Sequence, residues 1–237
     1  KASKKSDRAA IEGAVGFYSN ENITALIKVN SETDFAAKSD TFLDFLDSLG
    51  KIVLENNVII NKDEFLNLKY QQGHVQDYFN SMIAKIGENL ILNELLIKKN
   101  NDSNFSYYIH NSYRENIGKI ISLLEYSSND INNEVETLSK NLCMHVAAMK
   151  PEAIDIKDLD KIFLDNEKKI QKELIINSGK PSNIVDKILD GKMKKFYSDV
   201  TLLNQSYILD QDKSVREVIN DYSKFNYKLI SFELISL

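Results

Sequence analysis

Residues 13–53 read GAVGFYSNENITALIKVNSETDFAAKSDTFLDFLDSLGKIV, and this stretch contains two different hydrophobic periods. Gly13–Tyr18 and Ile23–Asn30 are rich in β-favouring residues and flank the turn-forming sequence SNEN, so they predict a β-hairpin. From Asp40 onward, apolar side chains recur at steps of three and four, which predicts a helix lying on that sheet. The residues on this stripe are Phe42, Phe45, Leu46, Leu49, Ile52 and Val53.

A helix and a strand follow, and then the order of hairpin and helix occurs a second time. Val75–Gly87 predicts a helix and Leu90–Ile97 a strand. Phe105–His110 and Lys119–Tyr126 then predict a second pair of strands around the loop NSYRENIG. The helix after them carries Ile131, Val135, Leu138, Leu142, Val146 and Met149. Because residue identity between the halves is slight, the repeat is one of architecture only.

The segment after this second helix predicts a helical hairpin. Leu159–Asn177 and Ser182–Phe196 are charged, helix-favouring segments joined by SGKP, in which glycine ends one helix and proline begins the next. A thin apolar seam is expected between the two helices, formed by Leu159, Ile162, Phe163, Ile170 and Leu174 with Ile184, Val185 and Ile188. Ser214–Ser223 then predicts a helix and Tyr227–Leu234 a last strand.

Together these patterns predict an α+β fold of two α/β subdomains, each a small antiparallel sheet with packed helices, plus an inserted helical hairpin. The expected boundaries are residues 1–104 for the N-terminal core subdomain, 105–155 with 207–237 for the C-terminal core subdomain, and 156–206 for the hairpin.

Composition excludes several classes of protein. The 237 residues are 43% hydrophobic, enough to form a substantial core. The formal net charge of -5 arises from 35 acidic and 30 basic residues that are mixed along the chain, so no basic stripe favours nucleic acid as a partner. Neither GxGxxG nor GxxxxGK[ST] occurs, which argues against a nucleotide-binding loop.

The sequence also gives no indication of a metal site, a membrane span or secretion. His74, His110 and His145 are far apart and form no zinc-type pair, so neither a metal nor a cofactor is expected. No apolar run approaches the ~20 residues of a membrane span, and residues 1–10 lack the apolar core of a signal peptide. The single cysteine, Cys143, excludes an internal disulfide and favours a cytoplasmic location.

The segment VNSETDFAAKSDTF, Val29–Phe42, places one aromatic ring among polar loop residues. A ring in such a loop either folds back onto the core or is held out for a partner, and Phe35 fits both interpretations. Asp34 likewise fits either a helix N-cap or a partner contact. His145 lies on an apolar helix face, which favours a satisfied core histidine over a ligand. Lys192–Phe196, KMKKF, is interpreted as a solvated helix face.

Five blocks of sequence resemble the elongation factor Ts family, the guanine-nucleotide exchange factors of elongation factor Tu. They occur in the family's order and span nearly the full chain: TDFAAKSDTF (33–42), AKIGEN (84–89), MHVAAMKPEAI (144–154), SGKP (178–181) with GKMKKFYSDVTLLNQSYI (191–208), and FEL (232–234). The resemblance implies two α/β subdomains with an inserted helical hairpin, in agreement with the prediction from the residues. It also implies a mechanical function without covalent chemistry, and hence no catalytic residues.

In this family the TDF loop enters the GTPase near its bound magnesium, with the aromatic ring inserted between partner side chains. Thr33, Asp34, Phe35 and Ala36 occupy those positions, and the resemblance favours the partner interpretation of Phe35. Ile86 and Gly87 match a further contact, although a core isoleucine beside a glycine C-cap explains the same residues. His110 matches the histidine at the tip of the family's second hairpin, in a loop that here carries Tyr113 and Arg114.

The function that the resemblance implies is binding to elongation factor Tu–GDP and promotion of GDP release by displacement of Mg²⁺. The alternative is a non-exchanging interaction module that binds a partner through the helical hairpin; a homodimer through the hairpin is also considered. Family members normally begin with a small helical module that makes additional binding contacts with the GTPase. The sequence begins at Lys1 without such a module, so either it is a fragment or the module was removed, and in both cases a lower affinity is expected.

Overall fold

A computed structural model describes residues 8–56, 61–101 and 103–237. The opening residues 1–7, which contributed to the argument against a signal peptide, lie outside the described part. The chain divides into two compact units, residues 1–126 with 233–237 and residues 127–232. The subdomain boundaries expected from the order of elements stay a prediction.

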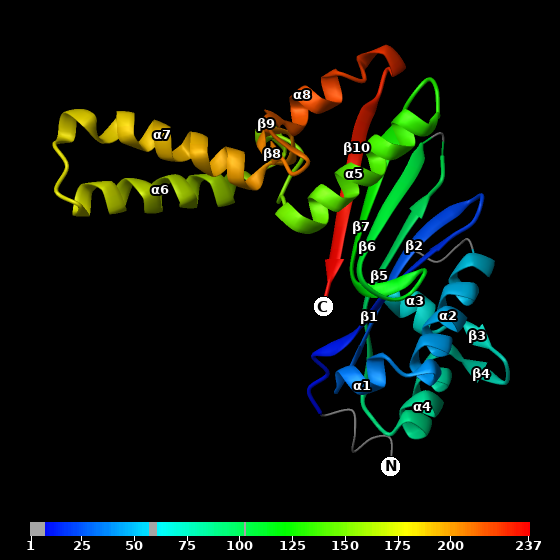
Figure 1. Cartoon of the computed structure of the whole chain (residues 1–237). Coiled ribbons are helices and arrows are strands. Elements are labelled where there is room, and N and C mark those ends of the chain that lie inside the picture. Colours follow the sequence, from blue (N-terminus) through cyan, green and yellow to red (C-terminus); the bar gives the residue numbers. More distant parts are fainter. Residues whose placement is uncertain (1–7, 57–60, 102) are drawn as a thin grey trace. The chain divides into compact units, whose positions relative to one another are not determined.

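The first unit is a twisted antiparallel sheet with helices packed on it (Figure 1). Its elements are β1 (Glu12–Ser19), β2 (Ile23–Ser31), α1 (Asp34–Ala37), α2 (Asp40–Glu55), α3 (Lys62–Leu66), β3 (Lys69–Tyr70), β4 (Gly73–His74), α4 (Val75–Ile86), β5 (Leu90–Lys99), β6 (Asn104–Arg114), β7 (Ile117–Ser127) and the end of β10 (Lys228–Ser236). The α+β class is confirmed.

The large strands form one six-stranded sheet in the order β10–β7–β1–β2–β5, with β6 also on β7. We expected two separate small sheets. They are joined because β7 pairs with β1, through Val15 with Gly118 and Gly16 with Ile117, and because Phe17 N–H donates to the Asn116 carbonyl at 2.8 Å. The hairpins β1–β2 and β6–β7 are each paired along most of their length, so the sheet consists of two well-paired parts with a narrow connection.

Alternation along the strands separates two apolar cores. In β2, Ala25, Ile27 and Val29 face the cluster that also contains the α2 and α4 side chains, whereas Leu26 belongs to a cluster with Ile121 of β7. The α2 stripe predicted from the sequence is buried throughout. Gly50 lets α2 approach the sheet closely, since a Cβ there would lie 2.2 Å from the Tyr18 ring.

The second unit consists of α5 (Asn133–Met149), α6 (Lys161–Asn177), α7 (Ser182–Val200), β8 (Ser206–Tyr207), β9 (Asp210–Ser214), α8 (Val215–Asn220) and most of β10. The predicted helix around residues 131–149 begins later than expected, after the N-cap Asn132, so Ile131 precedes it and is exposed. The predicted helix Ser214–Ser223 is shorter, because Ser214 is its N-cap and it ends at Asn220.

The predicted helical hairpin is present, with α6 and α7 antiparallel and side by side (Figure 1). The predicted seam is wrong for α6. Ile162, Ile170 and Leu174 of α6 are 71%, 51% and 54% exposed, and Phe163 is also exposed. On α7, the predicted Ile184 is exposed as well. The buried seam consists of Ile175, Leu189 and Met193 together with the predicted Val185, and the predicted Ile188 packs against it. The predicted Leu159 is also buried, just before α6 begins. The helical period allows more than one apolar face on α6, and packing against α7 selects the face that contains Ile175.

The hairpin is closed at its base by backbone hydrogen bonds. Leu202 N–H donates to the carbonyl of Ala153 at 2.9 Å, and Leu203 N–H donates to that of Ile154 at 3.0 Å. Glu152 N–H also donates to the Val200 carbonyl at 2.8 Å. The two ends of the arm therefore meet within the second unit.

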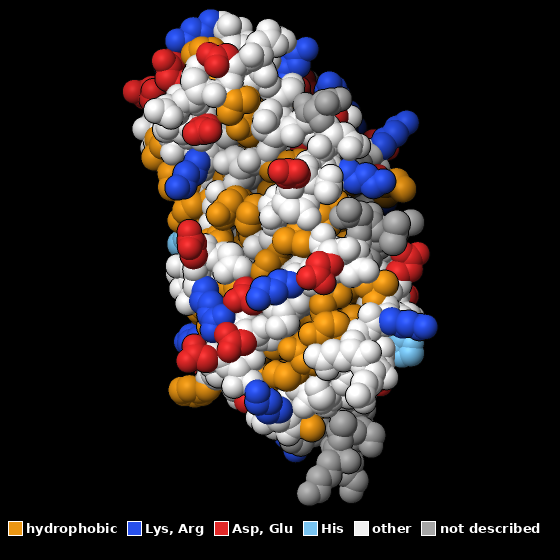
Figure 2. Space-filling view, turned by 90° about the vertical axis from the view of Figure 1, so that its right-hand side faces the viewer, with side chains coloured by type: hydrophobic (Ala, Val, Ile, Leu, Met, Phe, Trp, Pro, Cys, Tyr) orange, Lys and Arg blue, Asp and Glu red, His pale blue; other side chains and the backbone are white. Residues whose placement is uncertain are grey.

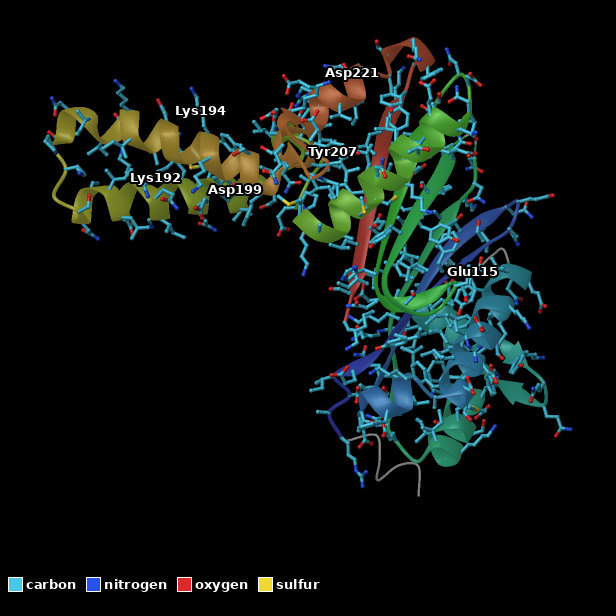
Figure 3. All side chains as sticks on the ribbon, viewed as in Figure 1. Glu115, Lys192, Lys194, Asp199, Tyr207 and Asp221 are labelled. Atoms are coloured by element: carbon cyan, nitrogen blue, oxygen red, sulfur yellow. The ribbon has the colours of Figure 1, made fainter. Side chains whose placement is uncertain are left out.

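On the hairpin, Lys192 lies between the helices, where its Nζ donates to Gln171 Oε1 at 3.1 Å, and Lys194 points away from α6 (Figure 3). Lys194 and Lys195 are exposed, as expected for a solvated face, whereas Met193 in the same run is buried.

No helix in the described ranges is long and apolar enough to cross a membrane. Figure 2 shows acidic and basic side chains interspersed on the face that it displays.

Candidate functional site

The Phe35 ring lies on the first turn of α1, and its side chain is 84% exposed, more than any other large apolar residue among those described. Its neighbours Ala36 and Ala37 are buried, and α1 contacts β1 and β2. The four-residue helix is thus anchored by two methyl groups while the ring points away from the core. The interpretation of Phe35 as a ring folded onto its own core is wrong.

Local hydrogen bonds fix both ends of α1. Thr33 is the N-cap, and its Oγ1 accepts a hydrogen bond from Ala36 N–H at 3.2 Å. Ser31 Oγ donates to the Thr33 carbonyl at 2.9 Å. At the other end, Ser39 Oγ donates to the Ala36 carbonyl at 2.7 Å while Ser39 caps α2. Phe35 is therefore carried by a short capped helix that connects β2 to α2.

Asp34 is not the N-cap of either helix, because Thr33 and Ser39 occupy those positions. Its carboxylate forms an ion pair with Lys38 Nζ at 2.8 Å. The hydrogen bond from Lys38 is the main cause that lowers the pKa of Asp34 below its ordinary value. The capping interpretation of Asp34 is therefore wrong, and its side chain stays charged at the surface beside Phe35.

A carboxylate from the connection between α4 and β5 holds the start of this loop. Glu88 Oε2 accepts from Thr33 N–H at 3.0 Å, and Glu88 Oε1 accepts from Thr33 Oγ1 at 2.6 Å. In the opposite direction, Glu32 Oε1 accepts from Asn89 N–H at 2.7 Å. Sequence reasoning singled out the AKIGEN block but missed Glu88. Nothing in its sequence context reveals a partner 55 positions away.

Ile86 and Gly87 lie beside the loop because they directly precede Glu88. Ile86 packs on the main core, and Gly87 ends α4 with φ 91°, its N–H donating to the Ile83 carbonyl at 3.0 Å. The structural explanation of both residues is therefore confirmed, and a partner contact at the same place stays a prediction.

His110 lies within β6 and not at the hairpin tip as expected. The strands extend through most of the NSYRENIG segment, and the turn is at Glu115–Asn116 (Figure 3 labels Glu115). The ordered side chain of Arg114 supports this extension, with ion pairs of 2.8 Å to both Asp44 and Asp47 of α2. His110 Nδ1 lies 3.4 Å from the hydroxyl oxygen of Tyr108 on its own strand.

A family model described as Elongation factor TS matches residues 32–237. The elongation factor Ts of Wolbachia pipientis wMel is 35% identical over 238 residues, covering 100% of this chain and 82% of that protein. The chain belongs to the elongation factor Ts family. The elongation factors Ts of Ehrlichia canis (strain Jake) and Limosilactobacillus reuteri (strain DSM 20016) are each 36% identical, covering 92% and 98% of this chain and 76% and 75% of those proteins.

Membership in the elongation factor Ts family makes the chain a translation elongation factor, with a role in protein biosynthesis. It confirms the resemblance carried by the five sequence blocks. The matched region includes the whole Thr33–Ala36 loop, the Ile86–Glu88 segment and the helical hairpin.

Two of the elongation factor Ts blocks meet in the second unit. His145 is fully buried; Ile208 N–H donates to its Nδ1 at 3.3 Å, so its Nε2–H donates to Gln205 Oε1 at 2.9 Å. Gln205 Nε2 in turn donates to the Asp199 carbonyl at 2.8 Å, near Tyr207, at the base of the hairpin (Figure 3). Burial lowers the pKa of His145. Its interpretation as a satisfied core histidine is confirmed.

Proposed function

We propose that this protein binds the GDP form of elongation factor Tu and accelerates GDP release, with the Thr33–Ala36 loop displacing the bound Mg²⁺. The observation that carries the proposal is the 84% exposure of Phe35 on a short helix that Thr33 caps and that Ala36 and Ala37 anchor to the core. A surface ring on a fixed turn is suited to burial in a partner. Family membership supports elongation factor Tu as that partner.

The energetics of this step are adequate for a noncovalent mechanism. GDP in a GTPase is held by Mg²⁺ and by backbone amides around its phosphates, so displacing the ion weakens several attractions together. Burial of one phenylalanine side chain stabilises the complex by roughly 1.5 to 3 kcal/mol. Because coupling between ligands is reciprocal, an exchange factor that binds the nucleotide-free GTPase more tightly must weaken GDP binding by the same factor. No bond is made or broken, so the protein is an exchange factor and not an enzyme in the covalent sense.

The remaining predicted contacts extend this surface. Ile86 and Gly87 adjoin the loop through Glu88 and are proposed as part of the same contact with elongation factor Tu. His110 is exposed on β6 and is proposed as a separate contact from the second hairpin.

The compartment that we assign is the cytoplasm, where translation elongation takes place.

The test is the rate of fluorescent GDP dissociation from purified elongation factor Tu, with excess unlabelled GDP and increasing amounts of this protein. We expect a rate that rises with concentration and saturates. Added free Mg²⁺ should oppose the acceleration, because it competes with displacement of the ion. A dissociation rate that is unchanged at saturating protein would contradict the proposal.

A second candidate is a non-exchanging interaction module that binds through the hairpin. The observation that favours it is the outward apolar surface of α6, where Ile162, Ile170 and Leu174 are exposed. The same surface is the one on which a homodimer would form. Sedimentation of the protein alone, and binding to elongation factor Tu without accelerated GDP release, would distinguish these possibilities from exchange activity.

A further inference from the structure

We propose that Glu88 is a positioning residue for nucleotide exchange: its carboxylate fixes Thr33 and thereby sets the direction in which Phe35 points. This inference rests on the proposed exchange function. Glu88 itself need not contact the partner, because its two hydrogen bonds act on the residue that caps the Phe35 turn.

A four-residue helix cannot hold a ring in place by itself. Isolated helices shorter than about 12 residues are marginal in water, so the orientation of α1 depends on its surroundings. The buried methyl groups of Ala36 and Ala37 attach it to the sheet, but Phe35 has little contact with its own chain. The serine hydrogen bonds at its two ends are local and move with the loop.

Glu88 is distant from the loop in sequence, and both of its carboxylate oxygens accept hydrogen bonds from Thr33. Oε2 accepts from the backbone N–H of Thr33, which fixes the peptide plane that enters the turn. Oε1 accepts from the Thr33 hydroxyl, which leaves the lone pair of Oγ1 to accept from Ala36 N–H. The carboxylate therefore fixes the Thr33 backbone and its side-chain rotamer together, and both determine the start of α1.

The neighbouring residues form a reciprocal contact. The Glu32 side chain accepts from the backbone of Asn89, while the Glu88 side chain accepts from the backbone of Thr33. Arg8 NH1 lies 3.4 Å from the Glu32 carboxylate and balances part of its charge. Glu32 and Thr33 are thus both hydrogen-bonded to the segment Glu88–Asn89. Two such contacts side by side resist both sliding and rotation of one segment against the other.

Loss of this connection is expected to reduce exchange through the fraction of molecules whose ring is correctly placed. In Glu88→Ala, we expect the maximal rate of GDP release to fall about tenfold, with a smaller change in the concentration that gives half-maximal rate. Glu88→Gln should restore most of the rate, since its Oε1 can accept from Thr33 N–H while its amide donates to Thr33 Oγ1. Glu94→Ala is the matched control, because it also removes one glutamate carboxylate, but Glu94 lies on β5 and its partner is Lys28.

The decisive experiment is a double-mutant cycle between Glu88→Ala and Phe35→Ala, measured as maximal GDP release. If Glu88 acts by placing the ring, its replacement should cost little once the ring is absent. Hydrogen exchange provides a readout without the partner: peptides covering residues 32–37 should exchange faster in Glu88→Ala, with the unfolding midpoint nearly unchanged.

A Glu88→Ala rate equal to that of the unaltered protein, or effects of the two substitutions that simply multiply, would overturn the inference. A general loss of stability in Glu88→Ala that Glu88→Gln does not reverse would also overturn it. Failure of the proposed function gives a different result, in which the unaltered protein itself does not accelerate GDP release.

Discussion

Replacing Phe35 by alanine separates a partner-binding ring from a structural one. Phe35 is 84% exposed, so only about one-sixth of the residue's surface is buried by its own chain. For an aromatic side chain of roughly 200 Å², this corresponds to less than about 1 kcal/mol of folding free energy at ~25 cal/mol per Å². A core phenylalanine such as Phe65, which is fully buried, should instead cost roughly 3 to 5 kcal/mol on truncation.

The effect on exchange should be much larger than the effect on stability. If the ring becomes buried in the partner as nucleotide leaves, its loss removes roughly 1.5 to 3 kcal/mol of stabilisation at that step, which corresponds to a 10- to 150-fold lower maximal rate of GDP release. The measurements are fluorescent GDP dissociation at saturating protein and thermal unfolding followed by circular dichroism. Phe65→Ala serves as the comparison and should lower the unfolding midpoint strongly.

The reasoning would be refuted by either of two results. If Phe35→Ala unfolds the protein, the ring contributes to the fold in a way that its exposure does not show. If Phe35→Ala accelerates GDP release as well as the unaltered protein, the loop does not act in exchange and the assignment of Thr33–Ala36 is wrong.

Four further perturbations test the fold and the site. Asp34→Ala should lower the maximal exchange rate less than Phe35→Ala and leave the midpoint unchanged, because exposed ion pairs contribute little stability; a large loss of stability would contradict this. Gly50→Ala should destabilise by roughly 1 to 3 kcal/mol in thermal melts, since the added methyl group collides with the Tyr18 ring; an unchanged midpoint would show that the ring can move away. Because burial lowers the pKa of His145, the unfolded state binds the proton more readily, so stability should fall as pH decreases below the ordinary histidine pKa of about 6.5. In thermal melts at pH 5 and pH 7, His145→Gln should weaken this pH dependence. An equal pH dependence in both proteins would refute the prediction. Replacing residues 157–198 by a short glycine–serine linker should preserve cooperative unfolding, because the hydrogen bonds at the base of the hairpin remain; a non-cooperative melt would contradict this.

Much of the fold follows from local sequence patterns. The β1–β2 hairpin, α2 and α4 were predictable because the side-chain periods of strands and helices act over a few residues. The end of α4 was predictable for a similar reason, as glycine readily adopts the left-handed conformation found at Gly87. The family was also recognisable from its sequence blocks alone.

Local patterns were misleading where long-range pairing supplied the missing interactions. Asn111–Gly118 contains residues typical of loops, yet β6 extends to Arg114 because its backbone pairs with β7 and its arginine pairs with aspartates of α2. On α6 the sequence offers several apolar positions at helical spacing, and only contact with α7 decides that Ile175 is buried while Ile170 is exposed.

By itself, the sequence determined most of the long helices and strands, the glycine that ends α4 and the family that the chain resembles, because these depend on near neighbours in the chain. It left open whether Phe35 faces the core or the solvent, since a polar loop with one aromatic ring is compatible with both. Only the tertiary structure decided this, by burying Ala36 and Ala37 and by bringing Glu88 to Thr33 across 55 positions of sequence. Such a contact depends on the packing of α4 and β5 beside β2, and no period or local propensity encodes it.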